Sequence, residues 1–390
     1  MLDDCLNILE LRDRARRRLP SAIFCFLDSA AETEVTLRRN SAAFDDVQLV
    51  PRCLSDVGKV NTSTRILGQD LEWPVICSPT GGSSFFHSQG ELAVARAAAA
   101  AGTLYGLSTA STYSIEEVAA ASRGPKMFQL YICKDRDFTH SLVERAKRSG
   151  FVSLCITVDT PVPGNCEKQL RAGVFGPWHK WPLSTALGFA RHPMWGLRRL
   201  HKGMHWLANF AGPDGRPARA EVLVEQLDPS ITWDDIRKVA DWWGGPLAIK
   251  GIMSVDDARR AADAGVTAII VSNHGGWQLD GAAAPIEVLP EIVGAVGNRL
   301  EVILDGGIRR GVHVLKALAC GAKACAIGRP YLYGLSAGGE VGVAKALDLL
   351  RTELVRAMQL AGCPNLASIN DSLIHGSPIM GILTEETPCS

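Results

Sequence analysis

LAIKGIMSVDDARRAADAGVTAIIVSN, residues 247–273, is the stretch of sequence that decides the fold. It has a short apolar run at each end, Leu247–Gly251 and Ala268–Asn273, and a helical pattern over Ser254–Ala264 between them. Apolar runs that are almost uninterrupted predict strands buried on both faces, as in a parallel sheet. The stretch therefore predicts one strand–helix–strand unit of an α/β protein.

The same alternation extends in both directions along the chain. Six further apolar runs complete a set of eight: Pro74–Ser78, Thr103–Ser108, Met127–Tyr131, Ser153–Asp159, Glu301–Asp305 and Ala324–Arg329. Eight strands, each followed by a helix, are the count of an α/β (β/α)8 TIM barrel. A doubly wound sheet is the alternative, but no GxGxxG pattern follows any of the runs.

The barrel does not need all 390 residues of the chain. We expect a single barrel domain over residues 1–390, with an N-terminal helical segment at 1–72 and a long insertion after the fourth strand at 164–246. Barrels of about 250 residues and more commonly form one domain. The extra length therefore predicts additions to one barrel.

Composition excludes several classes of protein. Lys+Arg and Asp+Glu both number 41, so no overall basic charge indicates nucleic-acid binding. No apolar run is long enough to span a membrane, and the first residues lack a secretory signal pattern. The 11 cysteines contain no CxxC pair, which is typical of reduced thiols and not of a disulfide frame or a zinc site. We expect a cytoplasmic protein without a metal site.

Residues 168–213 form a basic, Trp-rich part of the insertion. They contain no Asp or Glu, but seven Lys/Arg and four of the nine Trp. Around Leu197–Leu207 the apolar residues fall on one side of a helix that also carries Arg198, Arg199 and Lys202. This composition is typical of a helix that lies in a membrane interface. The alternative, a lid that packs on the barrel mouth and faces a neighbouring subunit, stays open.

Polar residues gather at the carboxyl ends of the predicted strands, where barrel enzymes bind their ligands. After the last two strands, DGGIRRG (Asp305–Gly311) and IGRP (Ile327–Pro330) combine glycines with arginines. Backbone N–H groups left accessible by glycines, together with a helix N-terminus at this position, are typical of a phosphate site. Plain tight turns are the alternative.

Three other strand ends carry side chains suited to redox chemistry. Lys250 would place a fixed positive charge in the barrel mouth, where it would stabilise the reduced, anionic ring of a flavin. A Schiff-base lysine is the competing interpretation. His274 is a candidate base, and Asp159 is the carboxylate that would orient its imidazole.

The segment Gly334–Gly338 matches the nucleophile-elbow pattern GxSxG. It does not follow a predicted strand directly, and only His375 lies downstream as a candidate triad base. We therefore expect Ser336 to be the N-cap of the last helix and not a nucleophile.

Together these motifs resemble the FMN-dependent α-hydroxy acid oxidase/dehydrogenase family. The likeness runs from about residue 10 to residue 370 and rests on FQLY, TVDTP, AIKGIMSVDDARRAADAGVTAIIVSNHGG, ILDGGIRRG and AIGRPYLYGL. Within the family, RHPMWGLRRLHKGMHWLANF looks most like the mandelate dehydrogenase branch, whose insertion attaches to membranes. The resemblance implies FMN as cofactor, a small-molecule substrate and a homo-oligomer, in this family a tetramer. It also makes peripheral contact with the inner face of the membrane through residues 177–212 an expectation.

The resemblance implies a role for each matched residue. His274, paired with Asp159, would take the hydroxyl proton while the substrate delivers a hydride equivalent to flavin N5, and Tyr131 would hydrogen-bond the substrate oxygen. Gly81, where many oxidases carry alanine, looks like the dehydrogenase members and points away from oxygen as electron acceptor. The implied cofactor-binding residues are Pro79, Thr80, Gly81, Ser108, Gln129, Thr157, Lys250, Ser272, Asp305, Gly307, Arg309, Gly328 and Arg329.

The substrate pocket departs from the family, which binds the substrate carboxylate with two arginines and a tyrosine. The matching positions here hold Trp277, Cys166 and Phe26. Losing one charged partner of a buried carboxylate costs about 2–5 kcal/mol. We therefore expect a substrate without a carboxylate, oxidised at a C–OH or C–N centre in a peptide or secondary-metabolite pathway. The family branch that matures the cofactor mycofactocin has lost its arginines similarly, but it does not carry Trp at position 277.

Two other functions stay open. An α-hydroxy acid like mandelate or lactate would need relocated cations, for which Lys168 and Arg171 in the acid-free loop are the candidates. A flavin-binding protein without turnover is the third hypothesis. The intact His274 and Asp159 argue against it, because a binding protein needs no base.

Overall fold

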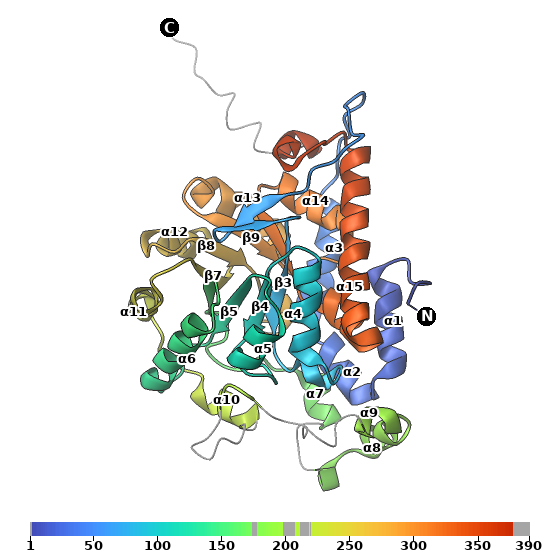
Figure 1. Ribbon diagram of the computed structural model, residues 1–390, viewed down its shortest axis with the longest axis vertical. Coiled ribbons are helices and arrows are strands. Elements are labelled where there is room, and N and C mark those ends of the chain that lie inside the picture. The colour runs from blue at the N-terminus through green and yellow to red at the C-terminus, as the bar shows by residue number, and fades with distance from the viewer. Residues whose placement is uncertain (1, 174–177, 198–206, 211–217, 219, 377–390) are drawn as a thin grey trace.

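The computed structural model describes residues 2–173, 178–197, 207–210, 218 and 220–376. Eight parallel strands form a closed barrel in the order β10-β3-β4-β5-β6-β7-β8-β9, with helices around it (Figure 1). The predicted (β/α)8 TIM barrel is thus confirmed. The strands are β3 (Val75–Thr80), β4 (Tyr105–Ser108), β5 (Lys126–Leu130), β6 (Ser153–Thr157), β7 (Leu247–Ile252), β8 (Ala268–Val271), β9 (Glu301–Asp305) and β10 (Ala324–Ile327).

The barrel strands are apolar because neither of their faces meets water. All four residues of β8 and all five of β5 are buried. One face of each strand lines the barrel interior and the other packs against the outer helices, as in parallel sheets generally. The helices of the outer ring are α4 (Gly90–Ala100), α5 (Ile115–Ala121), α6 (Arg136–Arg148), α11 (Trp233–Trp243), α12 (Val255–Asp263), α13 (Pro285–Val296), α14 (Gly311–Ala319) and α15 (Arg329–Leu360).

The N-terminal segment covers one side and one end of the barrel. It contains α1 (Ile8–Arg18), α2 (Ser21–Asp28), α3 (Val35–Asp46) and the hairpin of β1 (Thr64–Ile66) with β2 (Gln69–Leu71). Apolar residues of this hairpin pack on the interior residues near the starts of the barrel strands. The hairpin therefore closes the amino end of the barrel, and the carboxyl ends of the strands are left to form the site.

The insertion between β6 and α11 contains four short helices in the described part of the chain: α7 (Glu167–Ala172), α8 (Leu183–Ala190), α9 (Pro193–Leu197) and α10 (Ala220–Gln226). Most of the amphipathic helix expected near Leu197–Leu207 lies outside the described residues. No described helix combines the length and the apolar character needed to cross a membrane.

The expectation for Ser336 was wrong. Helix α15 begins at Arg329, with Pro330 in its first turn, and Ser336 is a buried residue inside it whose hydroxyl donates to the Leu332 carbonyl at 2.7 Å. Proline fits the first turn of a helix because its missing N–H has no partner there anyway. Ser336 is therefore neither an N-cap nor an exposed nucleophile.

Candidate active site

A buried charge network lies where β7, β8 and β9 end. Lys250 on β7 is 4% exposed, and its Nζ lies 3.0 Å from Ser272 Oγ and 3.2 Å from Asp305 Oδ2. The Ser272 hydroxyl in turn donates to Asp305 Oδ2 at 2.8 Å. Burial would lower the pKa of Lys250, but the carboxylates of Asp305 and Asp159 raise it above its usual value. The barrel mouth therefore holds a fixed positive charge.

His274 and Asp159 form a second pair beside this network. The ring Nδ1 of His274 lies 2.9 Å from Asp159 Oδ1. Burial would raise the pKa of Asp159, but His274 and Lys250 lower it below its usual value, so the carboxylate is ionised. An ionised carboxylate only accepts, so Nδ1 donates to Asp159 and Nε2 is the ring nitrogen left to face a substrate. The geometry is that of a general base with its orienting carboxylate.

Two residues with positive φ, His274 and Gly251, hold this pair in place. His274 has φ 58°, in the left-handed region, which is uncommon for residues other than glycine, although asparagine, aspartate and histidine adopt it more often than the rest. Such conformations persist only where the surroundings enforce them, and they cluster at functional sites. Gly251 has φ 107°, and a Cβ there would lie 2.7 Å from the Cβ of Asp159. Only glycine at position 251 leaves Asp159 its place against His274.

Neutral hydrogen-bonding groups end the neighbouring strands β4 and β5. The Ser108 hydroxyl donates to Gln129 Oε1 at 3.0 Å, and the backbone N–H of Thr109 donates to the same oxygen at 3.2 Å. These contacts fix the amide so that Gln129 Nε2 is buried without a hydrogen-bond partner among the described residues. Thr157 on β6 is also buried and pairs in register with Lys250. A buried unpaired donor costs about 1–3 kcal/mol, so we infer that a bound molecule accepts from Gln129.

The end of β3 lies beside this row, because β3 pairs with β4. The Tyr331 hydroxyl donates to the Ser78 carbonyl and lies 2.7 Å from Thr80 Oγ1, which fixes the threonine side chain. Pro79 precedes Thr80 within the same strand. Gly81 follows, and a Cβ there would lie 3.0 Å from the Cβ of Ala110, a tight contact.

The predicted phosphate site consists of two backbone turns. Gly307 follows β9 with φ 76°, and a Cβ there would lie 1.7 Å from the Asn40 carbonyl oxygen, so only glycine fits. Gly328 is the N-cap of α15. The first N–H groups of a long helix have no partner within the helix and attract anions. Arg309 lies on the first of these turns, where its guanidinium donates to the carbonyl of Ile308.

The side chain of Arg329 differs from its expected role. Its guanidinium donates to the carbonyls of Leu27, Ser29 and Gly275 at 3.2, 2.7 and 3.0 Å, respectively. It therefore ties the end of α2 to the turn after His274. We attribute any anion contact of Arg329 to its backbone N–H at the start of α15.

The three predicted pocket substitutions come together, as expected. Phe26 on α2 packs edge-on against Trp277, with ring centroids 5.3 Å apart. The buried Cys166 completes this wall, because its Sγ lies 3.8 Å from the Trp277 carbonyl oxygen. Phe85 and Phe86, which sequence reasoning missed, also contact Phe26. Both lie in GGSSFFHSQG, directly after β3, and this position at a strand end could have marked them as pocket residues.

Neither cation proposed as a replacement for the arginines lies free near this wall. Lys168 Nζ lies 2.5 Å from Glu34 Oε2, and Arg171 forms an i,i+4 pair with Glu167 at 2.8 Å. Their side chains are 56% and 78% exposed. Arg171 therefore serves a surface ion pair, and Lys168 is engaged by the buried carboxylate of Glu34.

Comparison with known proteins places these features in a family. Residues 15–376 match the family described as FMN-dependent dehydrogenase. The chain belongs to this family. An L-lactate oxidase of Nostoc sp. is 43% identical over 376 residues, which cover 95% of this chain and 98% of that protein.

Solved structures agree with this assignment. The monotopic membrane protein (S)-mandelate dehydrogenase is 35% identical, with a TM-score of 0.92 over 96% of this chain and 100% of its own. A mandelate oxidase variant with an arginine replaced by leucine, solved with 2-hydroxy-phenylacetamide, is 38% identical, with a TM-score of 0.76 over 93% of this chain and 97% of its own. The protein is thus an FMN-dependent oxidoreductase with the fold of the mandelate enzymes.

The residues at the barrel mouth fit the FMN cofactor of the family. The unpaired Gln129 Nε2 can donate to a flavin ring, and Lys250 supplies the positive charge that favours the reduced ring. The turns at Gly307 and Gly328 offer backbone N–H groups to the phosphate. Ring and phosphate sites therefore lie at the same end of one barrel.

Proposed function

We propose that this protein oxidises the C–OH centre of an α-hydroxy acid with His274 as the catalytic base. The observation that carries the proposal is the 2.9 Å contact between His274 and Asp159 beside the buried Lys250. The relatives named for lactate and mandelate favour this substrate class over the carboxylate-free substrate preferred from sequence alone. They give no support to a biosynthetic pathway.

Each catalytic side chain has a separate task in this proposal. Nε2 of His274 takes the hydroxyl proton, and Asp159 stabilises the imidazolium that results. Burial, with a smaller contribution from Asp159, raises the pKa of Tyr131, so its hydroxyl stays protonated and donates to the substrate oxygen. Lys250 provides a constant positive charge next to the cofactor. Bound FMN would supply the acceptor for the hydride equivalent that leaves the substrate carbon.

We assign the predicted cofactor residues to two groups. The ring group comes from the ends of β3 to β8 and the phosphate group from the turns after β9 and β10. The ring group is Pro79, Thr80, Gly81, Ser108, Gln129, Thr157, Lys250 and Ser272. The phosphate group is Gly307, Arg309, Gly328 and the backbone of Arg329, and Asp305 holds Lys250 between the two groups.

A carboxylate-free hydroxy compound is the second candidate substrate. Phe26 and Trp277 replace charged groups with an aromatic wall, and Lys168 and Arg171 are engaged elsewhere. A mandelate oxidase variant that has lost an arginine was solved with 2-hydroxy-phenylacetamide, in which a carboxamide stands in place of the carboxylate. A neutral amide suits an aromatic wall better than an anion does, because burying an unpaired charge is costly.

Two compounds separate the candidates, since mandelate and 2-hydroxy-phenylacetamide differ only at the carboxylate. Both should be mixed without oxygen with the FMN-loaded protein, and the rate of flavin bleaching measured against concentration. The first candidate predicts a higher second-order rate constant for mandelate. A higher constant for the amide would establish the second candidate instead.

We predict that Lys168→Ala and Arg171→Ala change kcat/KM for mandelate by less than about threefold, because both cations are engaged by glutamates and not held for a substrate. The measurement is steady-state kinetics of both variants beside the wild type. A loss of tenfold or more in either variant would mean that its side chain leaves its glutamate partner and binds the substrate carboxylate.

We further propose peripheral membrane contact through residues 177–212. Four large apolar side chains of α8 and α9 are exposed: Leu183 (75%), Leu187 (46%), Met194 (60%) and Leu197 (55%). Clustered exposed apolar side chains mark interaction surfaces. The monotopic mandelate dehydrogenase supports a membrane as the partner. The basic residues Arg198, Arg199 and Lys202 lie outside the described residues.

Neutralising Arg198, Arg199 and Lys202 to glutamine should weaken binding to anionic vesicles by about two orders of magnitude at low salt, since each basic residue near such a surface contributes about 1 kcal/mol. Co-sedimentation with phosphatidylglycerol vesicles measures this, with phosphatidylcholine vesicles as the uncharged control. Undiminished binding of the triple variant would contradict the electrostatic part of this proposal.

A further inference from the structure

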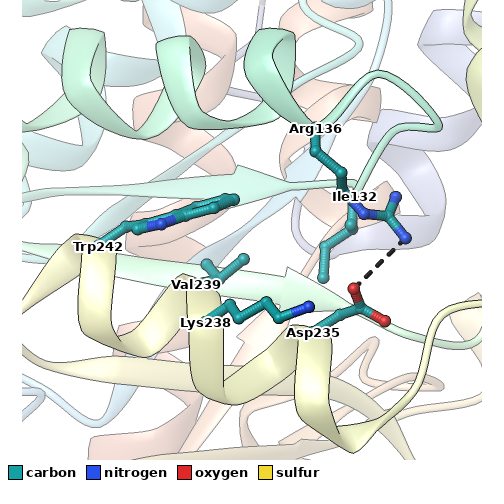
Figure 2. A pocket seen from close by; sticks show the side chains of 6 residues that line it. All are labelled: Ile132, Arg136, Asp235, Lys238, Val239 and Trp242. Atoms are coloured by element: carbon teal, nitrogen blue, oxygen red, sulfur yellow. Dashed lines mark ion pairs between the residues drawn. The ribbon is translucent and has the colours of Figure 1, made fainter.

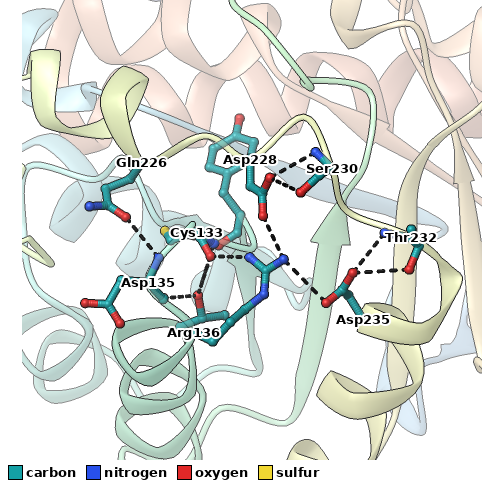
Figure 3. Close-up of polar contacts among 10 residues, drawn as sticks. Cys133, Asp135, Arg136, Gln226, Asp228, Ser230, Thr232 and Asp235 are labelled. Atoms are coloured by element: carbon teal, nitrogen blue, oxygen red, sulfur yellow. Dashed lines mark hydrogen bonds and ion pairs between the residues drawn. The ribbon is translucent and has the colours of Figure 1, made fainter.

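The insertion rejoins the barrel along the loop that carries Tyr131. We name residues Gln226–Asp235 the return limb; it follows α10 and runs into α11. The backbone N–H of Lys134 donates to the Gln226 carbonyl at 2.9 Å, and the N–H of Asp135 donates to the side-chain oxygen of the same glutamine at 3.3 Å. Cys133 and Leu227 form an antiparallel bridge. The return limb therefore pairs with the β5–α6 loop, Tyr131–Asp135, as Figure 3 shows.

Arg136 joins the two segments through its guanidinium. It donates to the Cys133 carbonyl of the loop and lies 2.7 Å from Asp228 Oδ2 and 3.4 Å from Asp235 Oδ1 of the return limb (Figure 3). The two carboxylate side chains are only 11% and 15% exposed. Without the guanidinium, two carboxylates of the return limb with little access to water would lose the cation that they share.

Each carboxylate is also fixed within the return limb. Asp228 accepts from the N–H and hydroxyl of Ser230 at 2.9 and 2.6 Å. Asp235 accepts from the N–H of Thr232 at 2.9 Å, in the capping box that begins α11. Because these local contacts hold both acids in place, Arg136 meets a preformed pair of acceptors. A guanidinium can serve three acceptors at once, which an ammonium on a flexible stem does less well.

Packing around the loop is incomplete on this side, although Ile132 and Cys133 are themselves buried. A cavity of about 150 Å³ lies between α6 and α11, lined by Ile132, Arg136, Asp235, Lys238, Val239 and Trp242. Figure 2 shows Ile132 of the loop on one side of this cavity and the residues of α11 on the other, with the Arg136–Asp235 ion pair at its edge. Ion pairs and backbone hydrogen bonds therefore act together with the packing of Ile132 and Cys133 to hold the loop against the return limb.

We propose that Arg136 is a positioning residue of the substrate pocket, which holds the Tyr131 loop and the returning insertion in one fixed arrangement. The inference rests on the proposed function, because Tyr131 is the substrate contact that the loop carries. The Tyr131 N–H also donates to Thr109 Oγ1 at 3.3 Å, so the loop has one further anchor on the neighbouring strand end. Arg136 adds an ion-paired anchor to the backbone contacts on the insertion side.

The test uses FMN-loaded Arg136→Ala and Arg136→Lys, with Arg237→Ala as the matched control. Arg237 lies on α11 and pairs only with the exposed Asp234 among the contacts described, at 3.1 Å. Hydrogen–deuterium exchange of residues 131–135 and 226–235 gives a readout that does not depend on turnover. KM and kcat for the better of the two substrates above give the second readout.

We expect Arg136→Ala to speed exchange in both segments at least tenfold, to raise KM about tenfold and to change kcat less than threefold. Arg136→Lys should lie between this variant and the wild type, and Arg237→Ala should match the wild type. Unchanged exchange would overturn the proposal outright. Faster exchange with an unchanged KM would overturn the link to the pocket and leave Arg136 purely structural.

Two controls separate this inference from the proposed function. If neither substrate reacts with the wild type, the proposed function fails, but the exchange readout still tests the anchor. If Arg136→Ala does not fold, Asp228→Asn removes one charge of the same network and keeps its shape. It should speed exchange in the same two segments, and unchanged exchange in that variant would equally overturn the proposal.

Discussion

His274→Asn is expected to slow flavin bleaching by the substrate by a factor of about 10²–10⁴, the usual contribution of a positioned general base. Asparagine suits the site because it tolerates the left-handed backbone, with φ 58°, that His274 adopts. Its side-chain amide can donate to Asp159 as the imidazole does. The variant therefore removes the basic nitrogen and little else, and FMN content should equal that of the wild type.

The pH dependence gives the mechanism a sharper test. A base must be unprotonated to accept the hydroxyl proton, so the wild-type kcat/KM should fall as pH is lowered, and this fall should disappear in His274→Asn. Asp159→Asn serves as the comparison, since it keeps the base but removes the carboxylate that stabilises the imidazolium. A His274→Asn variant within tenfold of the wild-type rate would mean that another group takes the proton.

Trp277→Arg is expected to raise kcat/KM for mandelate about 30-fold or more, because a buried charged partner of a carboxylate is worth about 2–5 kcal/mol. Trp277 lies next to Phe26 and Cys166, and these are the positions at which the family resemblance implies carboxylate-binding groups. The new guanidinium can rest against the ring of Phe26 and still reach an anion. Steady-state kinetics with mandelate and with 2-hydroxy-phenylacetamide measure the effect.

The amide and a second variant serve as controls for this gain. The carboxamide bears no charge, so Trp277→Arg should change its kcat/KM by less than about threefold. Trp277→Leu opens the same space without a cation and should not improve mandelate oxidation. If Trp277→Leu matched Trp277→Arg, the gain would come from space and not from charge, and the account of the aromatic wall would be wrong.

The barrel could be predicted because its signal is local in the sequence. A strand buried on both faces needs an apolar run, and the runs at Leu247–Gly251 and Ala268–Asn273 contain most or all of β7 and β8. Helices begin where capping residues allow, so α6 and α12 start after Asp135 and Ser254, whose side chains accept from the first turn. Once the barrel was predicted, the candidate site residues could be read from the carboxyl ends of its strands, where barrel enzymes bind their ligands.

Partners that are distant in sequence could not be predicted. Lys168 was a candidate for the substrate carboxylate, yet it pairs with Glu34, a residue 134 positions away. Arg329 was expected at the phosphate, yet its guanidinium donates to carbonyls near α2 and beside His274. A side chain that can serve several acceptors leaves no pattern in its own neighbourhood that tells which one it finds. The same holds for Arg136 and the return limb.

The central claim is that the intact base and flavin site still oxidise an α-hydroxy acid although the carboxylate-binding arginines are gone. Absorbance near 450 nm, followed while (S)-mandelate is added without oxygen to the FMN-loaded protein, tests it most directly. The account predicts that the band bleaches in the wild type and that bleaching is slowed at least a hundredfold in His274→Asn, the lower end of the effect of a general base. A band that stays unchanged in the wild type at saturating mandelate, with FMN bound, would contradict it.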